Sequence, residues 1–327
     1  VRVASGGRAP EAPAATVKLN PVGRVPYTLH RMYEKIVIPL DRITQQRVIG
    51  GTSIDVDNVD GDYVKRQFRS LAQRAVNQRV LLLMGLLRGI LYGHSIGDSV
   101  YYDFTSSGAN FNIDWRMPSG NKSTLNILGS GAILDAEWDL VGTNIPLHIG
   151  KIRAALSSLY GGDIEIAMCN QQTFTWIAEN DQVRSLAGTV NTPVVYQSID
   201  VEAGTDVDGK PIPLRLATAI LPAIPWLTWI VTDAGLKIGS PGSEAFEPFF
   251  PAGYVWFGPR PTPEFFEMMV GSEVVVEKPG GTAASRTGLY AYSMMTGDPA
   301  AVQCYVLDNC LPANYIPNAS CYATVYT

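Results

Sequence analysis

Residues 62–92, DYVKRQFRSLAQRAVNQRVLLLMGLLRGILY, decide the fold more than any other part of this sequence. Apolar residues recur through this stretch at helical spacing, and the turn-rich DVDNVDGD before it supplies residues that cap a helix start. We therefore expect one helix over residues 62–92, about 45 Å long at 1.5 Å per residue. Its first half is amphipathic and its second half is almost wholly apolar, which is typical of a helix that packs against a sheet.

Two aromatic segments of β type follow this helix. Residues 99–104 (SVYYDF) and 110–115 (NFNIDW) flank the turn-forming TSSGA. This pattern predicts a β-hairpin with large aromatic side chains. Residues 93–97 (GHSIG) are then expected to form the turn between the helix and the hairpin.

The centre of the chain reads as a helix–strand–helix unit. Pro146 opens a helix that runs through Tyr160, the strand IEIAMC ends at Cys169, and Asn170 caps a second helix. These elements predict an α/β lobe.

Further strands are expected after this lobe. The Asp208-Gly209 turn separates two β-type runs, and residues 224–231 and 253–257 read as buried strands. The strands from Tyr290 onward are expected to return to the sheet that the hairpin begins.

Three cysteines are clustered near the end of the sequence. Cys304, Cys310 and Cys321 lack the tight pair that a zinc site needs, and no histidine lies near them in the sequence. Residues 301–307 and 321–326 are rich in β-branched and aromatic residues, with turn formers at 308–320 that include Leu311-Pro312. We expect these cysteines to be small apolar residues in or beside strands, with no metal and no cofactor.

The composition excludes several function classes. The 327 residues are 46% hydrophobic and 17% charged, with a formal net charge of -5, so a protein that reads nucleic acid through a global basic field is disfavoured. The most apolar run, residues 80–91, is shorter than the roughly 20 residues that span a bilayer, so we expect no membrane segment, and no signal peptide either. The opening VRVASGGRAPEAPAATVKLNP has no apolar periodicity and is expected to be an extended arm or loop.

One enzymatic motif needs a test. Gly93-His94-Ser95-Ile96-Gly97 fits the G-x-S-x-G nucleophile elbow, which requires a strand before the serine and a helix after it. The sequence predicts the reverse flanks, and His148 follows too soon for the usual order of the triad. A hydrolase that uses Ser95 stays as a distant alternative, and a secreted β-rich binding module is disfavoured because no disulfide framework is present.

The order of elements resembles the tailed-bacteriophage major capsid fold, and in particular the lambda-type major head protein (capsid protein E) family. The resemblance rests on VRVASGG and the Pro/Ala-rich stretch after it, the helix ending GILYG, and the hairpin SVYYDFTSSGANFNIDW. The segment YSMMTGDPAAVQCYVLDNCLPANYIPNASCYATV is its most specific part.

This resemblance implies an α+β fold with four parts. Residues 1–60 would form an N-terminal extended arm and E-loop, and residues 61–124 a peripheral domain with a long spine helix and a β-hairpin sheet. Residues 125–286 would form an axial α/β domain, and residues 287–327 would return as strands to the peripheral domain.

The resemblance also implies a structural, non-enzymatic subunit of a phage virion. Such a subunit forms hexamers and pentamers in an icosahedral shell around packaged double-stranded DNA, with portal, scaffold and possible decoration proteins as partners and no membrane. An encapsulin-like compartment shell is the alternative within the same fold. The expected assembly contacts are Arg2, Arg8, Lys18, Arg24, Tyr101, Phe104 and Trp115, and the residues expected to face DNA are Arg66, Arg69 and Arg74.

Overall fold

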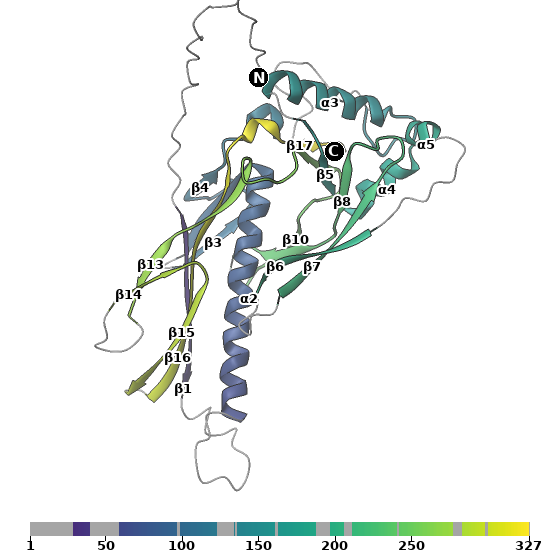
Figure 1. Cartoon of the computed structure of the whole chain (residues 1–327). Helices are drawn as coiled ribbons and strands as arrows, with labels where there is room; N and C mark the ends of the chain where they lie inside the picture. Colours follow the sequence, from purple (N-terminus) through teal and green to yellow (C-terminus); the bar gives the residue numbers. More distant parts are fainter. Residues whose placement is uncertain are drawn as a thin grey trace, which may run out of the picture.

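The computed structural model describes residues 29–39, 59–96, 99–122, 134, 136–160, 163–187, 197–205, 211–240, 242–276, 283–297 and 300–326. The long helix α2 (Val59–Arg88) runs beside a four-stranded sheet, and the helices α3, α4 and α5 surround a second, six-stranded sheet (Figure 1). The fold is therefore α+β, as the resemblance to the capsid family implies.

The four-stranded sheet is built around one long strand, β16 (Ala300–Asn314). Along one side β16 pairs antiparallel with β1 (His30–Pro39), and it also pairs with β15 (Tyr290–Gly297) and β12 (Phe266–Val270). Residues alternate between the faces of a strand, so Cys304, Val306 and Asp308 face α2 while Tyr305 and Leu307 lie on the opposite face.

The six-stranded sheet holds the largest apolar core. Its order is β17 (Cys321–Thr324), β11 (Tyr254–Gly258), β5 (Ile166–Cys169), β8 (Thr228–Val231), β7 (Pro211–Ile220) and β6 (Gln197–Thr205). Strands β5 and β8 are parallel, and the other pairs are antiparallel. Helices α3 (Ile145–Tyr160), α4 (Gln171–Glu179) and α5 (Asp181–Ala187) pack around the buried side chains of Trp138, Phe174, Trp229 and Phe257. This unit is the predicted α/β lobe, and the Asn170 side chain caps α4 as predicted by accepting a hydrogen bond from the Thr173 amide.

Smaller strand groups complete the described structure. There are two two-stranded ribbons: β9 (Gly235–Ile238) with β10 (Ala245–Pro248), and β13 (Ser272–Val275) with β14 (Ala284–Thr287). Two short 3-10 turns lie at Ser119–Asn121 and Pro317–Ala319.

The predicted end of the long helix is wrong by four residues. Helix α2 stops at Arg88, because Gly89 adopts a φ of +82°, a left-handed conformation that favours glycine and ends helices. The apolar residues after it belong to strand β2 (Ile90–Ile96), so GHSIG lies largely within a strand and is not the turn that we expected.

The predicted hairpin is also rearranged. Strand β2 lies between β3 (Ser99–Asp103) and β4 (Phe111–Asp114), so the two aromatic segments pair with β2 and not with each other. Gly93 allows this arrangement because a Cβ at that position would clash with the ring of Phe111. The turn signal between the segments was correct, but the third strand covers the last residues of the expected helix and most of the expected turn at residues 93–97.

The C-terminal strands do not return to the sheet of β2, β3 and β4. Strands β15 and β16 form the separate four-stranded sheet, and β17 joins the six-stranded sheet beside β11. The boundary expected at residues 286/287 therefore does not coincide with a sheet boundary, because β12 precedes it and also pairs with β16.

Two strand limits differ from the prediction. Leu311 and Pro312 continue β16 opposite β12. A strand tolerates proline where the missing N–H is not needed for pairing. The Pro312 carbonyl accepts a hydrogen bond from Trp115 Nε1 at 2.6 Å on the side where no strand pairs. Of residues 224–231, only Thr228–Val231 form a strand, β8, and the residues before it are turns.

Candidate assembly core and surfaces

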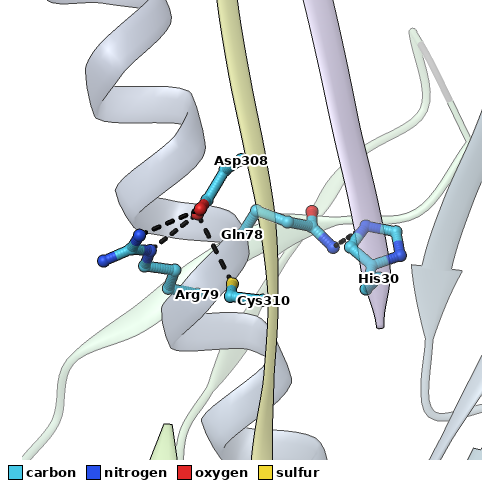
Figure 2. Close-up of polar contacts among 5 residues, drawn as sticks. All are labelled: His30, Gln78, Arg79, Asp308 and Cys310. Atoms are coloured by element: carbon cyan, nitrogen blue, oxygen red, sulfur yellow. Dashed lines mark hydrogen bonds and ion pairs between the residues drawn. The ribbon is translucent and has the colours of Figure 1, made fainter. Parts of the chain in front are cut away.

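A polar cluster joins the middle of α2 to β16. The carboxylate of Asp308, buried on β16, accepts hydrogen bonds from Arg79 Nε at 2.6 Å and Arg79 Nη2 at 2.9 Å (Figure 2). This two-pronged geometry is the strongest that an arginine and a carboxylate can form. The hydrogen bond to Asp308 raises the pKa of Arg79, so the guanidinium keeps its charge throughout the pH range in which proteins fold.

Two further groups extend the cluster on the same strands. The Cys310 thiol donates to Asp308 Oδ2 at 3.4 Å, and burial raises its pKa to about 12. His30 at the start of β1 has Nε2 3.3 Å from Gln78 Nε2 and Nδ1 2.7 Å from the Tyr102 hydroxyl, which lies on β3 (Figure 2 shows His30 and Gln78). Burial lowers the pKa of His30, against the opposing influence of Asp308. A neutral imidazole therefore links α2, β1 and β3.

A second clamp holds the end of α2. Arg88 donates to Glu247 Oε1 at 2.8 Å and to the carbonyls of Pro248 and Phe249 at 2.7 and 3.2 Å. Its guanidinium also lies 3.8 Å from the ring centroid of Phe104. Since Arg79 pairs with Asp308 on β16, the helix is fixed to strands at its middle and at its end.

Ser95 does not have the surroundings of a nucleophile elbow. It lies inside β2, and the described chain continues into β3 and not into a helix. His94 is its neighbour in the strand, so the two side chains point to opposite faces, and His94 Nε2 lies 2.9 Å from Asp103 Oδ1. The Ser95 amide donates to Asn110 Oδ1 at 2.7 Å, which ties the strand to the loop before β4.

The expected assembly contacts lie in different environments. Arg2, Arg8, Lys18 and Arg24 lie outside the described residues. Tyr101 is partly exposed and stacks on His94, and Phe104 is partly exposed beneath Arg88. Trp115 has no accessible surface within the subunit, so any effect that it has on assembly passes through the stability of the subunit itself. Tyr101 and Phe104 as subunit contacts remain a prediction.

The cysteines lie where the sequence places them, in or beside strands. Cys169, Cys304, Cys310 and Cys321 are all free and buried. Within the described part of the chain, no group of histidine, cysteine, aspartate or glutamate residues is placed to hold a metal ion. None of the described helices is long and apolar enough to cross a membrane.

The face of the four-stranded sheet opposite α2 carries stacked tyrosine rings, which sequence reasoning missed. The centroids of Tyr292 and Tyr305 lie 4.8 Å apart with nearly parallel rings, and Tyr33 and Tyr290 extend the stack on either side. The hydroxyls of Tyr33 and Tyr292 lie 2.9 Å apart. These residues come from β1, β15 and β16, and their spacing within each strand gave no signal that they would meet.

Comparison with known proteins gives a likeness in structure alone. No family model matches the sequence, and no curated protein matches it. The crystal structure of a protein assigned as a prophage capsid protein of E. coli CFT073 superposes with a TM-score of 0.52 at 14% identity, over 91% of this chain and 77% of that one.

Two further solved structures are similar at lower scores. A Mycobacterium phage Patience structure has a TM-score of 0.41 at 11% identity, over 98% of this chain and 78% of that one. A Synechococcus elongatus encapsulin complex has a TM-score of 0.39 at 10% identity, over 91% and 74%. From the long helix beside its sheet, the α/β lobe and the match to the E. coli prophage protein, we conclude that the chain has the tailed-phage major capsid fold.

Proposed function

We propose that this chain is a structural major capsid protein. It assembles into hexamers and pentamers that form the icosahedral shell of a tailed phage around packaged double-stranded DNA. The observation that carries the proposal is the shared fold with the prophage capsid protein across 91% of the chain. The role is non-enzymatic, and the location is the virion.

The exposed apolar surface supports a protein that makes many subunit contacts. Leu186 on α5, Val274 on β13 and Met295 on β15 are 62%, 66% and 69% exposed. These residues belong to a helix beside the six-stranded sheet, to the β13–β14 ribbon and to the four-stranded sheet. Exposed apolar side chains on several elements favour a subunit with several neighbours over one with a single partner.

The proposed arrangement in the shell follows the fold. The lobe around the six-stranded sheet, which includes β17, lies near the symmetry axes, and α2 with the four-stranded sheet of β1, β12, β15 and β16 forms the periphery. A closed shell that takes up DNA needs an opening and a template for its size. Portal and scaffold proteins, with a possible decoration protein, are therefore the proposed partners.

The exposed side of α2 is the proposed contact with packaged DNA. Lys65, Arg66, Arg69 and Arg74 are exposed there, although Arg74 Nε lies 3.1 Å from Glu34 and is partly neutralised. Each contact between a basic side chain and a phosphate adds to the affinity for DNA. A face with few positive charges therefore binds DNA weakly, which allows the DNA to be released later.

Charge reversal tests the contact with DNA. We expect Arg66→Glu/Arg69→Glu shells to keep their mass and to contain less DNA per particle. The matched control is Arg260→Glu, a change at an arginine whose side chain is 73% exposed and whose Nε lies 3.9 Å from Glu165 Oε2. An unchanged DNA content in the double variant would remove these arginines from the proposal.

The proposed function itself is tested by sedimentation velocity on nuclease-treated native particles that contain this chain. A megadalton particle is expected, with nuclease-resistant DNA inside it. A megadalton shell without DNA would favour the encapsulin-like alternative. A species of one or two chains would refute the shell, and loss of an esterase activity in Ser95→Ala would then support the hydrolase.

A further inference from the structure

Strand β15 is the least protected strand edge of the four-stranded sheet. Its sequence, YAYSMMTG, contains no charged residue and no proline. The face with Tyr292 packs into the tyrosine stack, while Ala291, Ser293 and Met295 on the other face are exposed. At 69%, Met295 is the most exposed large hydrophobic side chain among the described residues.

The outer edge of β15 lacks a strand partner among the described strands, in addition to its exposed face. Among the described strands β15 pairs only with β16, so the backbone groups on its other side have no strand partner. Helix α2 packs over β16 and β1 and leaves the β15 side of this face uncovered. Proteins normally protect a free edge with charges, proline or a covering element, because an unprotected edge pairs with other chains.

The opposite edge of the same sheet shows that protection. Strand β1 also pairs only with β16 among the described strands, yet it presents exposed Arg31 and Lys35 and ends at Pro39. One sheet therefore has one guarded edge and one open edge. The difference points to a partner for β15 and to none for β1.

We propose that β15 pairs with β15 of a second copy of this chain, antiparallel and about a twofold axis close to Ser293. This proposal rests on the proposed function and names one contact in the shell. With the axis at Ser293, Ala291 lies opposite the partner's Met295 and Tyr292 opposite the partner's Met294. Side chains that share a face stay together, as an antiparallel pair requires.

The absence of charge is what selects a second copy as the partner. A twofold strand pair places residues opposite their own equivalents or near neighbours, so any charge on the strand faces a like charge. No such repulsion arises for β15, whereas two β1 strands paired in this way would bring Arg31 and Lys35 of each copy close together. The pairing would also cover Met295 and turn two four-stranded sheets into one continuous sheet.

Disulfide trapping tests the pairing. In the double variant Ser293→Cys/Met295→Cys, an axis at or beside Ser293 brings a new thiol within reach of its equivalent or its neighbour in the other copy. We expect oxidised shells to show a reducible dimer band in place of the monomer on a non-reducing gel. The native cysteines are buried and do not contribute.

The matched control places two cysteines on the guarded edge. Lys35→Cys/Val37→Cys has the same spacing on an exposed strand face and is expected to remain monomeric on the gel. Shells of native mass in which the β15 variant gives no dimer, or no more dimer than the control, would overturn the pairing and leave the capsid proposal intact. If the unchanged chain forms no shell, the capsid proposal fails first, and the pairing fails with it.

Hydrogen exchange on the unchanged protein covers the case in which the double variant does not assemble. The β15 amides that do not bond to β16 are expected to exchange slowly in shells and rapidly in dissociated subunits, with no such change in β1. Equal exchange of the β15 amides in both states would overturn the pairing.

Discussion

Arg79 and Asp308 form a two-pronged ion pair although 229 positions separate them in the chain. Arg79 lies in the middle of α2, and Asp308 lies on the central strand of the sheet that α2 covers. The pair can form only when α2 is packed against the four-stranded sheet.

Removing the charge of Asp308 is expected to destabilise the subunit strongly. Asp308→Asn leaves the Arg79 guanidinium without its counter-charge beside a carboxamide, at a cost of about 3 kcal/mol in the free energy of unfolding. Urea unfolding of the dissociated subunit measures this cost.

The control for this change is Asp163→Asn. Asp163 pairs with Arg153 in the same two-pronged geometry, but their side chains are 50% and 39% exposed. An exposed pair is worth at most about 1 kcal/mol. Similar losses in the two variants would contradict the view that burial of the pair gives Asp308 its importance.

His30 predicts a loss of stability in mild acid. Because burial lowers the folded-state pKa of His30 below 6.5, the unfolded chain binds the proton more tightly than the folded chain. This contribution to stability is complete above pH 6.5 and is lost as the pH falls through 6.5 toward the lower folded-state value. Urea midpoints measured between pH 7.5 and 5.5 should fall less in His30→Gln than in the unchanged protein, and equal slopes would show that His30 is not responsible.

Gly85 and Gly150 predict opposite effects of the same change. A Cβ at Gly85 would lie 2.8 Å from Trp115 Cζ3 and 2.9 Å from Leu91 Cβ, so Gly85→Ala should destabilise the subunit by about 1–3 kcal/mol through overpacking. Nothing lies within 4 Å of a Cβ at Gly150, and Gly150→Ala should stabilise helix α3 by about 0.5–1 kcal/mol. Thermal unfolding measures both, and a stabilising Gly85→Ala would show that Trp115 is less tightly held than the structure indicates.

The cysteines should be inert in the folded subunit. Burial raises the pKa of Cys304 to about 11 and that of Cys310 and Cys321 to about 12, so little reactive thiolate exists at pH 8. Ellman's reagent should react with all four thiols in denaturant and with none in the native subunit during the dead time of mixing. Fast native labelling of any of these thiols would contradict their burial.

Periodic elements could be predicted from the sequence, because a local pattern determines them. The helix α2, the lobe with α3, β5 and α4, and the strand character around the cysteines all follow from spacing and capping residues. The end of α2 could not be placed, since Ile90 and Leu91 continue the apolar pattern and only the conformation of Gly89 marks the change.

Pairing across long distances could not be predicted. Nothing local to β2 indicates that it lies between β3 and β4, and nothing near Pro312 indicates that Trp115 bonds to its carbonyl from 197 positions away. The Arg79–Asp308 pair and the tyrosine stack depend on the same long-range registers. The residues of such a cluster can be identified only once the pairing of the strands is known.

The position of β16 in the chain sets the timing of folding during synthesis. Helix α2 leaves the ribosome well before its partner strand, and the ribosome adds 229 residues between Arg79 and Asp308. At a synthesis rate of roughly 5–20 residues per second, the apolar side of α2 that contacts β16 stays uncovered for on the order of 10–45 seconds. A nascent chain therefore cannot present a finished sheet to other subunits, and it is a natural client for chaperones until β16 has been made.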